Sequence, residues 1–340
     1  MASVFGNNIK LSIFGQSHSE AIGMNFDGLP CGFKIDMDEL KLFLSRRAPG
    51  RSKLTSKRSE KDVPEFVSGL FDGKTCGAPL AALIYNEDVR SADYEDIKDS
   101  PRPSHADFTA EGKFRGYQDY RGGGHFSGRL TAALCVAGGI AIQMLERNGI
   151  KVKAVLESVC GQKSGIDELI AEAISEGDSL GGTIACTIGG LPCGVGEPMF
   201  DGLENRISQA VFAIPAVKGI EFGDGFKLSE LKGSEARDEY VASDGKIALT
   251  SNHNGGILGG ISTGEAVNFR VCIKPTPSIS MPSKSVSYSR GENVELKISG
   301  RHDPCIALRA VPCVEAAAAI AVLDLMLGDI NFSGRFVFND

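Results

Sequence analysis

The sequence has no excess of positive charge, no long apolar run and no tryptophan. Its 36 lysines and arginines are outnumbered by 43 acidic residues, so the 340 residues carry a net charge of −7. Nucleic-acid-binding domains are usually basic, so bulk binding of DNA or RNA is disfavoured. No uninterrupted apolar run reaches about 18 residues, and we predict no membrane span. The first residues lack the basic and apolar regions of a secretory signal, which indicates a cytoplasmic protein.

Closely spaced metal ligands are also missing. None of the nine cysteines forms a Cys-x-x-Cys pair, and the five histidines show no His-x-x-x-His spacing. We therefore expect no metal site and no disulfide framework. The apolar surroundings of Cys135, Cys186 and Cys272 predict buried, reduced thiols. No Walker lysine pattern occurs, and no G-x-G-x-x-G stands in a βαβ frame, which disfavours an ordinary nucleotide site.

Glycine, in contrast, is abundant, and three of its 42 copies stand together at 122–124. Three consecutive glycines permit positive φ angles. The apolar, helix-like run from Leu130 to Gln143 follows, so the free N–H groups of a helix start would face the loop. Together with Arg121, Ser127 and Arg129, these donors suit a phosphate-sized anion. A tight loop that merely connects two elements is the alternative.

Predicted strands and helices are interleaved along the whole chain. The apolar patterns and the turn residues predict strands over 9–15, 78–85, 152–159, 182–189 and 266–273, and helices over 37–47, 130–148, 167–175, 203–217 and 309–327. Residues 86–126 read as a long, polar, turn-rich segment. No composition break divides the chain, so we expect a single α/β or α+β domain over 1–340.

Two features suggest chemistry on a small anionic molecule. All five histidines (18, 105, 125, 253 and 302) lie in loops rich in Gly, Pro, Ser or Asn. Each alone reads as a hydrogen-bonded surface residue, but loops often carry function and histidine exchanges protons near neutral pH. Residues 46–62 hold seven basic and two acidic side chains, a balance of +5 in an acidic chain. This segment is either a solvated loop or one that closes over an anionic ligand, and the acidic context favours the second.

Seven segments together resemble the chorismate synthase family. They run in the family's order and cover nearly the whole chain: 14–18 (FGQSH), 46–50 (RRAPG), 102–107 (RPSHAD), 120–129 (YRGGGHFSGR), 251–260 (SNHNGGILGG), 274–278 (KPTPS) and 301–305 (RHDPC). The resemblance implies an α+β fold of one large domain, a β-α-β sandwich that assembles as a homotetramer. It implies a lyase that converts 5-enolpyruvylshikimate 3-phosphate to chorismate and phosphate with reduced FMN, and with NADPH as a flavin reductant in some members.

The resemblance also implies roles for individual residues. His18 matches a histidine that protonates the departing phosphate, and His105 matches one that maintains the protonation state of reduced flavin. Asp303 matches a carboxylate that helps to move a proton at the flavin. The other implied positions are Ser17 and Ser127 as supporting catalytic hydroxyls; His125, Phe126, Ser127, Ala216, Val217, Gly259, Lys274, Pro275, Thr276, Pro277, Ser278 and Arg301 as FMN contacts; and Arg47 and Lys53 as contacts to substrate or NADP.

Three segments depart from the family pattern, at four positions. Gln16 stands where the family commonly has Glu, Ser104 where it has Gly, and His125-Phe126 where it has Arg-Ser. A flavin- or nucleotide-binding module without catalysis and a phosphate-sensing structural protein are the alternative functions. The proton-transfer groups favour the enzyme, because a carrier has no use for them.

Overall fold

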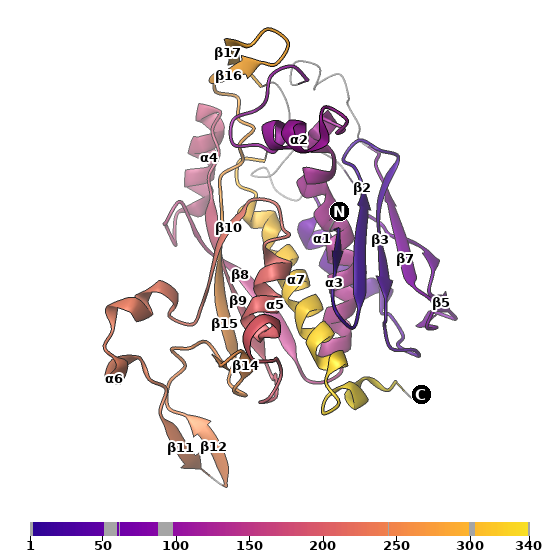
Figure 1. Ribbon diagram of the computed structural model, residues 1–340, viewed down its shortest axis with the longest axis vertical. Coiled ribbons are helices and arrows are strands. Elements are labelled where there is room, and N and C mark those ends of the chain that lie inside the picture. The colour runs from indigo at the N-terminus through magenta and orange to yellow at the C-terminus, as the bar shows by residue number, and fades with distance from the viewer. Residues whose placement is uncertain are drawn as a thin grey trace.

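Two antiparallel sheets enclose a layer of helices (Figure 1). The computed structural model describes residues 3–50, 60, 62–87, 98–243, 245–298 and 303–338. One sheet has the strand order β1 (Val4–Phe5), β2 (Lys10–Gly15), β3 (Ala21–Asp27), β7 (Leu80–Tyr85) and β4 (Glu65–Ser68). The other has the order β10 (Val217–Phe222), β15 (Val267–Ile273), β9 (Gly182–Gly189) and β8 (Lys151–Val159). The α+β sandwich implied by the family resemblance is confirmed.

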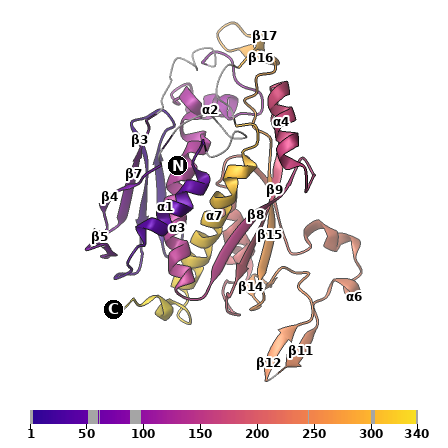
Figure 2. The same cartoon turned by 180° about the vertical axis from the view of Figure 1, so that it is seen from behind.

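Four helices fill the space between the sheets: α1 (Met37–Arg47), α3 (Thr131–Glu146), α5 (Leu203–Val211) and α7 (Ala307–Gly328). Helix α3 contacts β3 and β7, whereas α7 contacts β8 and β9, and the two helices pack against each other (Figure 2). Alternate residues of β15, from Val267 to Ile273, are buried against this layer, as the predicted alternation of apolar side chains requires.

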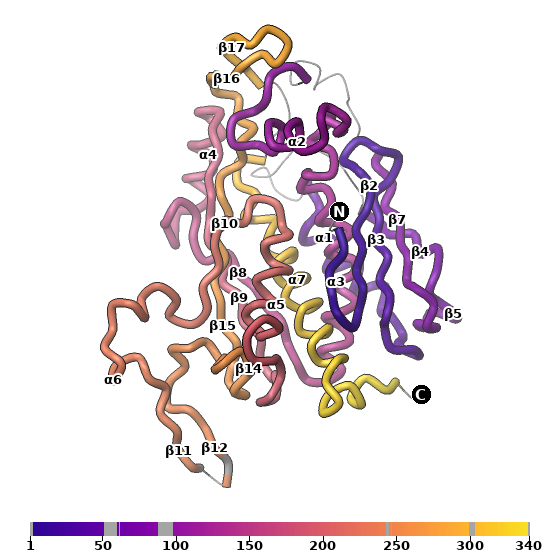
Figure 3. The backbone as a smooth tube through the Cα atoms, viewed as in Figure 1, coloured from indigo at the N-terminus to yellow at the C-terminus, as the bar shows by residue number. Residues whose placement is uncertain are grey.

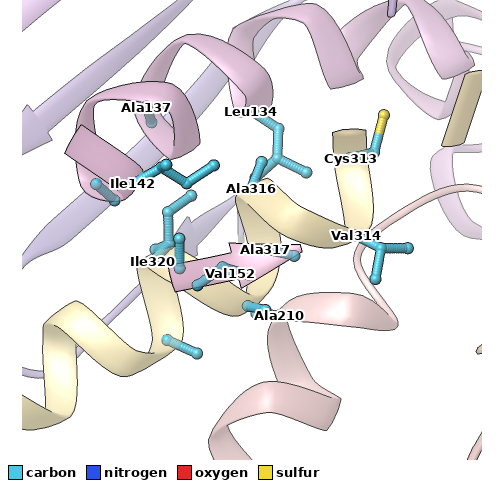
Figure 4. Packing of buried hydrophobic residues seen from close by; sticks show 14 of the residues in the cluster. Leu134, Ala137, Ile142, Val152, Ala210, Cys313, Val314, Ala316, Ala317 and Ile320 are labelled. Carbon is cyan, nitrogen blue, oxygen red and sulfur yellow. The ribbon is translucent and has the colours of Figure 1, made fainter. Parts of the chain in front are cut away.

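Small side chains let α3 and α7 approach closely. A Cβ added to Gly138 would lie 2.1 Å from the Cβ of Ala316, and one added to Gly139 would lie 2.6 Å from Leu40 Cδ1 of α1. Figure 4 shows Ala316 of α7 beside Leu134 of α3, and Ala317 beside Val152 of β8, in the resulting core. This glycine pair thus admits neighbouring helices at close range. Both helices are apolar and long enough to cross a membrane, but 94% and 89% of their apolar windows are buried inside the fold.

The remaining elements lie at the periphery. The helices are α2 (Asp107–Phe114), α4 (Ile166–Glu176) and α6 (Gly233–Ala236), and the short strands are β5 (Leu70–Phe71), β6 (Lys74–Thr75), β11 (Tyr240–Ser243), β12 (Lys246–Leu249), β13 (Ile257–Leu258), β14 (Ile261–Ser262), β16 (Ser283–Ser287) and β17 (Glu292–Leu296). The segment that carries α6 and the β11–β12 hairpin projects away from both sheets (Figure 3).

Several sequence predictions need correction. The helix predicted over 203–217 ends at Val211, because Pro215 disfavours a helical conformation at the residue before it, and Val217 already begins β10. The segment 86–126 contains α2, which its polar composition and Gly112 concealed. Cys272 is exposed rather than buried, although Cys135 and Cys186 are buried as predicted. Helix α1 is confirmed with its cap, since Asp36 Oδ1 accepts the N–H groups of Asp38 and Glu39 at 3.0 Å each.

Candidate active site

A cavity of about 840 Å³ opens where the two halves of the sandwich meet. Its wall combines the β1–β2 segment, the glycine loop and the start of α3 with the chain before β10, residues 274–278 and the first turns of α7. The volume is in the range of ligand sites that hold cofactor-sized molecules. Apolar groups, among them Leu134, Val217 and Ala317, form part of the wall beside polar groups.

Positive charge dominates the polar part of the wall. Its cations are Arg47, Arg102, Arg129, Arg309, Lys218 and Lys274, whereas its carboxylates are Glu60 and Asp303. Each arginine has a carboxylate partner, but neither lysine forms an ion pair with any described residue. Burial and the charge of Lys218 lower the pKa of Lys274. Unneutralised lysines at a cavity wall attract anions.

The glycine loop lies against two histidines. Gly122, Gly123 and Gly124 have φ angles of 59°, 82° and 54°, which a side chain would strain. A Cβ on Gly122 would lie 2.2 Å from the ring of His18, and one on Gly123 would lie 3.2 Å from the ring of His105. Gly122 and Gly123 are thus required for the close approach of the two imidazoles, whereas a Cβ on Gly124 would lie 2.2 Å from Asp119 O.

The predicted direct entry from this loop into a long helix is wrong. A 3₁₀ turn, Gly128–Leu130, intervenes, and α3 starts only at Thr131. Ser127 Oγ accepts the N–H of Arg129 at 3.3 Å and so caps the turn. The free amides therefore belong to a short turn at the cavity wall instead of to the first turn of α3.

His105 is anchored by its neighbours in the segment 102–107. Its Nδ1 lies 2.7 Å from Asp107 Oδ1, and Arg102 holds the same carboxylate through Nε–Oδ2 and Nη2–Oδ1 bonds of 2.7 and 2.8 Å. Arg102 Nη1 also donates to Ser278 Oγ at 3.3 Å. This arginine therefore ties the histidine loop to residues 274–278, which follow a strand of the other sheet.

Ser104 adopts a left-handed conformation, with a φ of 60°, at the position where the family commonly has glycine. Its carbonyl accepts a 2.6 Å bond from Lys274 Nζ, which adds a second tie between the two loops. The family's glycine is explained by this φ, because a Cβ makes the left-handed region unfavourable. Serine at this position stores strain beside His105.

We predict that Ser104→Gly stabilises the protein by about 0.5–1 kcal/mol. Relief of about 1–2 kcal/mol of left-handed strain outweighs the greater freedom that glycine gives the unfolded chain. Urea unfolding monitored by circular dichroism measures the difference. Ser164→Gly is the matched control at a residue without positive φ, and it should destabilise slightly. A loss of stability in Ser104→Gly would contradict the strain assignment.

His18 and Ser17 lie behind the glycine loop. Both are buried, with 7% and 4% of their surface exposed, and neither lines the cavity. The ring of His18 touches the position that a Cβ of Gly122 would occupy, and Ser17 N donates to Gly124 O at 3.0 Å. Gly122 itself lines the cavity. The structure thus places His18 one residue layer behind the cavity wall.

Asp303 lines the opposite side of the cavity, just before α7. Its Oδ2 accepts a 2.6 Å bond from Arg309 Nη1, and its main-chain oxygen accepts from Thr276 Oγ1 at 2.8 Å. Its Oδ1 is buried and has no hydrogen-bond partner among the described residues. One carboxylate oxygen is therefore held while the other remains available to a ligand.

The residues predicted to contact FMN divide into two groups. Those that line the cavity are His125, Phe126, Ser127, Ala216, Val217, Lys274, Thr276, Pro277 and Ser278. Pro275 and Gly259 do not line it, and Gly259 forms the exposed turn between β13 and β14. The ring of His125 is engaged by Gly15 O at 2.8 Å and Ser3 Oγ at 2.9 Å. Arg301 lies outside the described residues.

Arg47 is buried and forms part of an arginine–aspartate cluster. It donates to Asp62 at 2.6 Å, to Thr131 Oγ1 at 3.1 Å and to Gly128 O at 3.1 Å, and Asp62 also binds Arg129. Burial alone would raise the pKa of Asp62, but the two guanidinium groups lower it. Arg47 thus holds together the base of the cavity, while Lys53, the other predicted contact, lies outside the described residues.

Three cavity residues were missed at the level of sequence, namely Arg102, Arg309 and Lys218, and so was Asp107, the partner of His105 behind the cavity wall. Arg102 and Asp107 lie within a segment that carried the family resemblance, so the charged residues flanking His105 were the available signal. Arg309 follows Asp303 by six residues at the start of α7, and no local pattern marks it. No sequence pattern around Lys218 marks it as a cavity residue.

Comparison with known proteins identifies the family that has this architecture. The family model described as chorismate synthase matches residues 9–327. The chain belongs to the chorismate synthase family. Chorismate synthase from Chitinophaga pinensis is 46% identical, with 95% of this chain and 96% of that protein covered. Chorismate synthase from Korarchaeum cryptofilum is 42% identical, with 94% and 96% covered.

A solved structure agrees with the chorismate synthase fold. The crystal structure of a chorismate synthase superimposes with a TM-score of 0.74 and covers 98% of this chain and 96% of its own, at 23% identity. At this identity the likeness supports the fold alone. The two-sheet sandwich with its helical layer is therefore the chorismate synthase architecture.

Proposed function

We propose that the cavity is the active site in which this chorismate synthase family member converts 5-enolpyruvylshikimate 3-phosphate to chorismate and phosphate, a step of aromatic amino-acid biosynthesis. The observation that carries this proposal is the convergence on one cavity of His105, Asp303 and two lysines that form no ion pair with a described residue. Segments from both halves of the fold form this cavity. The enzyme is a lyase of the family to which the chain belongs.

The reaction is a 1,4-elimination without net oxidation or reduction. The allylic C–O bond breaks with its electron pair going to phosphate, a C–H proton is lost, and the double bonds rearrange. Negative charge develops on the leaving phosphate, and cations fixed in a partly buried site stabilise it without reorganisation. Half-buried Lys274 is placed for this role, and exposed Lys218 lies at the same wall. The family resemblance makes His18 the proposed donor of a proton to the departing group, from its place behind Gly122.

The cavity fits a flavin together with the substrate. Its volume of about 840 Å³ and the apolar part of its wall suit a planar ring system. The cationic part of the wall suits the phosphate at the end of that molecule, and the unpartnered Oδ1 of Asp303 is open to the ligand. Reduced FMN, when bound, supplies electron density to the substrate's double bond. The cavity-lining residues Phe126, Ala216, Lys274 and 276–278 would hold it, and His105 and Asp303 would exchange protons at its edge.

Further properties are proposed from the family resemblance. They are reduction of the flavin by NADPH or by a separate source, assembly as a homotetramer and a cytoplasmic location. A flavin-binding module without chemistry is the competing proposal, but no observation favours it. His105 with its anchoring carboxylate would have no task in a carrier.

We predict that Lys274→Met raises the KM for the enolpyruvyl substrate about tenfold at low salt. Loss of an unneutralised ammonium at the wall removes about 1.4 kcal/mol of attraction to an anion. The loss should shrink as ionic strength rises, because salt screens this attraction. Steady-state kinetics at two salt concentrations measure it, with Lys227→Met on an exposed helical turn as the control. An unchanged KM at low salt would remove Lys274 from the anion site.

Phosphate release tests the function itself. The protein, dithionite-reduced FMN and the substrate are mixed without oxygen, and phosphate and chorismate are measured. We expect both products with reduced FMN and neither with oxidised FMN. Flavin binding without phosphate release, in protein shown to be folded, would support the carrier instead.

A further inference from the structure

The two ring nitrogens of His105 have different surroundings. Nδ1 lies 2.7 Å from Asp107 Oδ1 and 3.0 Å from Arg102 Nη2. The Nε2 side packs against the glycine loop, where a Cβ on Gly123 would lie 3.2 Å from Nε2. The ring lines the cavity, and no hydrogen bond to Nε2 is seen among the described residues. The two nitrogens therefore have separate tasks.

The donor and acceptor chemistry places a proton on Nδ1. Asp107 Oδ1, the nearer neighbour of Nδ1, can only accept a hydrogen bond. Arg102 Nη2 can only donate and by itself would favour an accepting Nδ1, but its contact is longer, at 3.0 Å, and it also donates to Asp107 Oδ1 at 2.8 Å. An unprotonated Nδ1 would direct its lone pair at the carboxylate oxygen 2.7 Å away, which is repulsive. With Nδ1 protonated, Asp107 accepts from it, and the neutral ring keeps its lone pair on Nε2.

Asp107 is itself held rigidly. Its Oδ2 accepts from the backbone N–H of Arg102 at 3.0 Å and from Arg102 Nε at 2.7 Å, while Arg102 Nη2 donates to Oδ1 at 2.8 Å. Burial would raise the pKa of Asp107, but hydrogen bonds from Arg102 and His105 outweigh it and hold that pKa well below its ordinary value. Asp107 also begins α2, where negative charge is favoured.

We propose that Asp107 is a positioning residue for the elimination: it fixes His105 with its proton on Nδ1, so that Nε2 presents a lone pair to the cavity and accepts a proton there. This inference rests on the proposed function. Asp107 does not line the cavity and acts only through the histidine. The hydrogen bonds that link Arg102, Asp107 and His105 thus orient the ring, and Gly123 packs against its other side.

Asp107→Asn is the decisive variant, because it keeps the shape and changes the hydrogen bonding. The two donors from Arg102 at Oδ2 will select the amide oxygen, so the amide NH₂ will face His105 Nδ1. Nδ1 must then accept, and the ring proton moves to Nε2. We expect kcat to fall about 10²-fold or more with KM changed less than about threefold. Glu111→Gln, on the same helix and bonded to Gln118, is the control and should stay within about twofold of wild type.

Asp107→Glu separates positioning from structural support. The longer side chain restores an accepting carboxylate but fits less well, so we expect kcat at least about tenfold above that of Asp107→Asn. A residue that served only to fill space would show the reverse order. Asp107→Asn within about threefold of wild type, or Asp107→Glu below Asp107→Asn, would overturn the proposal.

Two further measurements separate positioning from structural support, and the second does not depend on turnover. In the double variant H105A/D107N, kcat should lie within about twofold of H105A alone, because Asp107 acts through the ring; multiplied losses would contradict this. Solid-state ¹⁵N spectra of flavin-free protein labelled at its histidine rings, with H105A as the assignment, should show the neutral His105 proton on Nδ1 in wild type and on Nε2 in Asp107→Asn. An unchanged tautomer would overturn the proposal. Inactive wild-type protein would instead refute the proposed function.

Discussion

His105→Ala lowers kcat by about 10²–10⁴-fold, the usual contribution of a positioned acid–base group. The ring faces the cavity on one side and is anchored by Asp107 on the other, so its removal deletes a proton acceptor and leaves Asp107 without one of its partners. The fold should persist, because Arg102 still holds the carboxylate. Anaerobic phosphate release with reduced FMN measures the loss.

The chain offers a matched control for this variant. His253 Nδ1 lies 2.7 Å from Asp224 Oδ2, which is the same kind of pair, but His253 does not line the cavity. His253→Ala should keep kcat within about threefold of wild type. A similar loss in both variants would show that a histidine–aspartate pair matters here for structure and not for chemistry.

Gly122→Ala should damage both stability and turnover. The left-handed φ of 59° and a Cβ only 2.2 Å from the ring of His18 together cost about 2–5 kcal/mol of unfolding free energy, unless the ring moves. If the ring moves, stability recovers but His18 leaves its place, and kcat falls at least about tenfold. Denaturant unfolding and phosphate release on the same preparation measure both effects.

Gly112→Ala is the control for an added methyl group. Gly112 lies in α2, has no positive φ, and a Cβ there would meet nothing within 4 Å. Alanine should stabilise this helix by up to about 1 kcal/mol and leave turnover unchanged. If Gly122→Ala behaved like Gly112→Ala, the glycine loop would not be required for the approach of His18.

The sequence predicted the layers of this fold better than the details of its site. Long apolar runs located α3 and α7, which are buried on most sides, and the alternation of apolar and polar residues located β15. The end of α5 was misplaced because the run up to Val217 stays apolar, and only Pro215 marks the change. Helix α2 was missed because it is largely polar, contains Gly112 and buries only Ala110, so it shows no clear apolar face.

The glycine loop shows why site geometry escapes a reading of the sequence. The three glycines at 122–124 indicated positive φ angles, and the structure confirms them. The sequence did not indicate which residues contact the loop, because His18 and His105 come from distant segments and meet it only in the folded chain. The Arg102–Asp107 pair was visible as charges beside His105, but its hydrogen bonds depend on the turn before α2.

The central claim is that this cavity carries out a redox-neutral elimination with the help of reduced flavin. Phosphate, chorismate and the flavin absorbance are followed together in one anaerobic reaction, for wild type and for His105→Ala. The account predicts equal amounts of phosphate and chorismate over many turnovers, no net oxidation of the flavin, and a rate lower by at least about 10²-fold in the variant. Flavin oxidised in step with product, or equal rates in the two proteins, would contradict it.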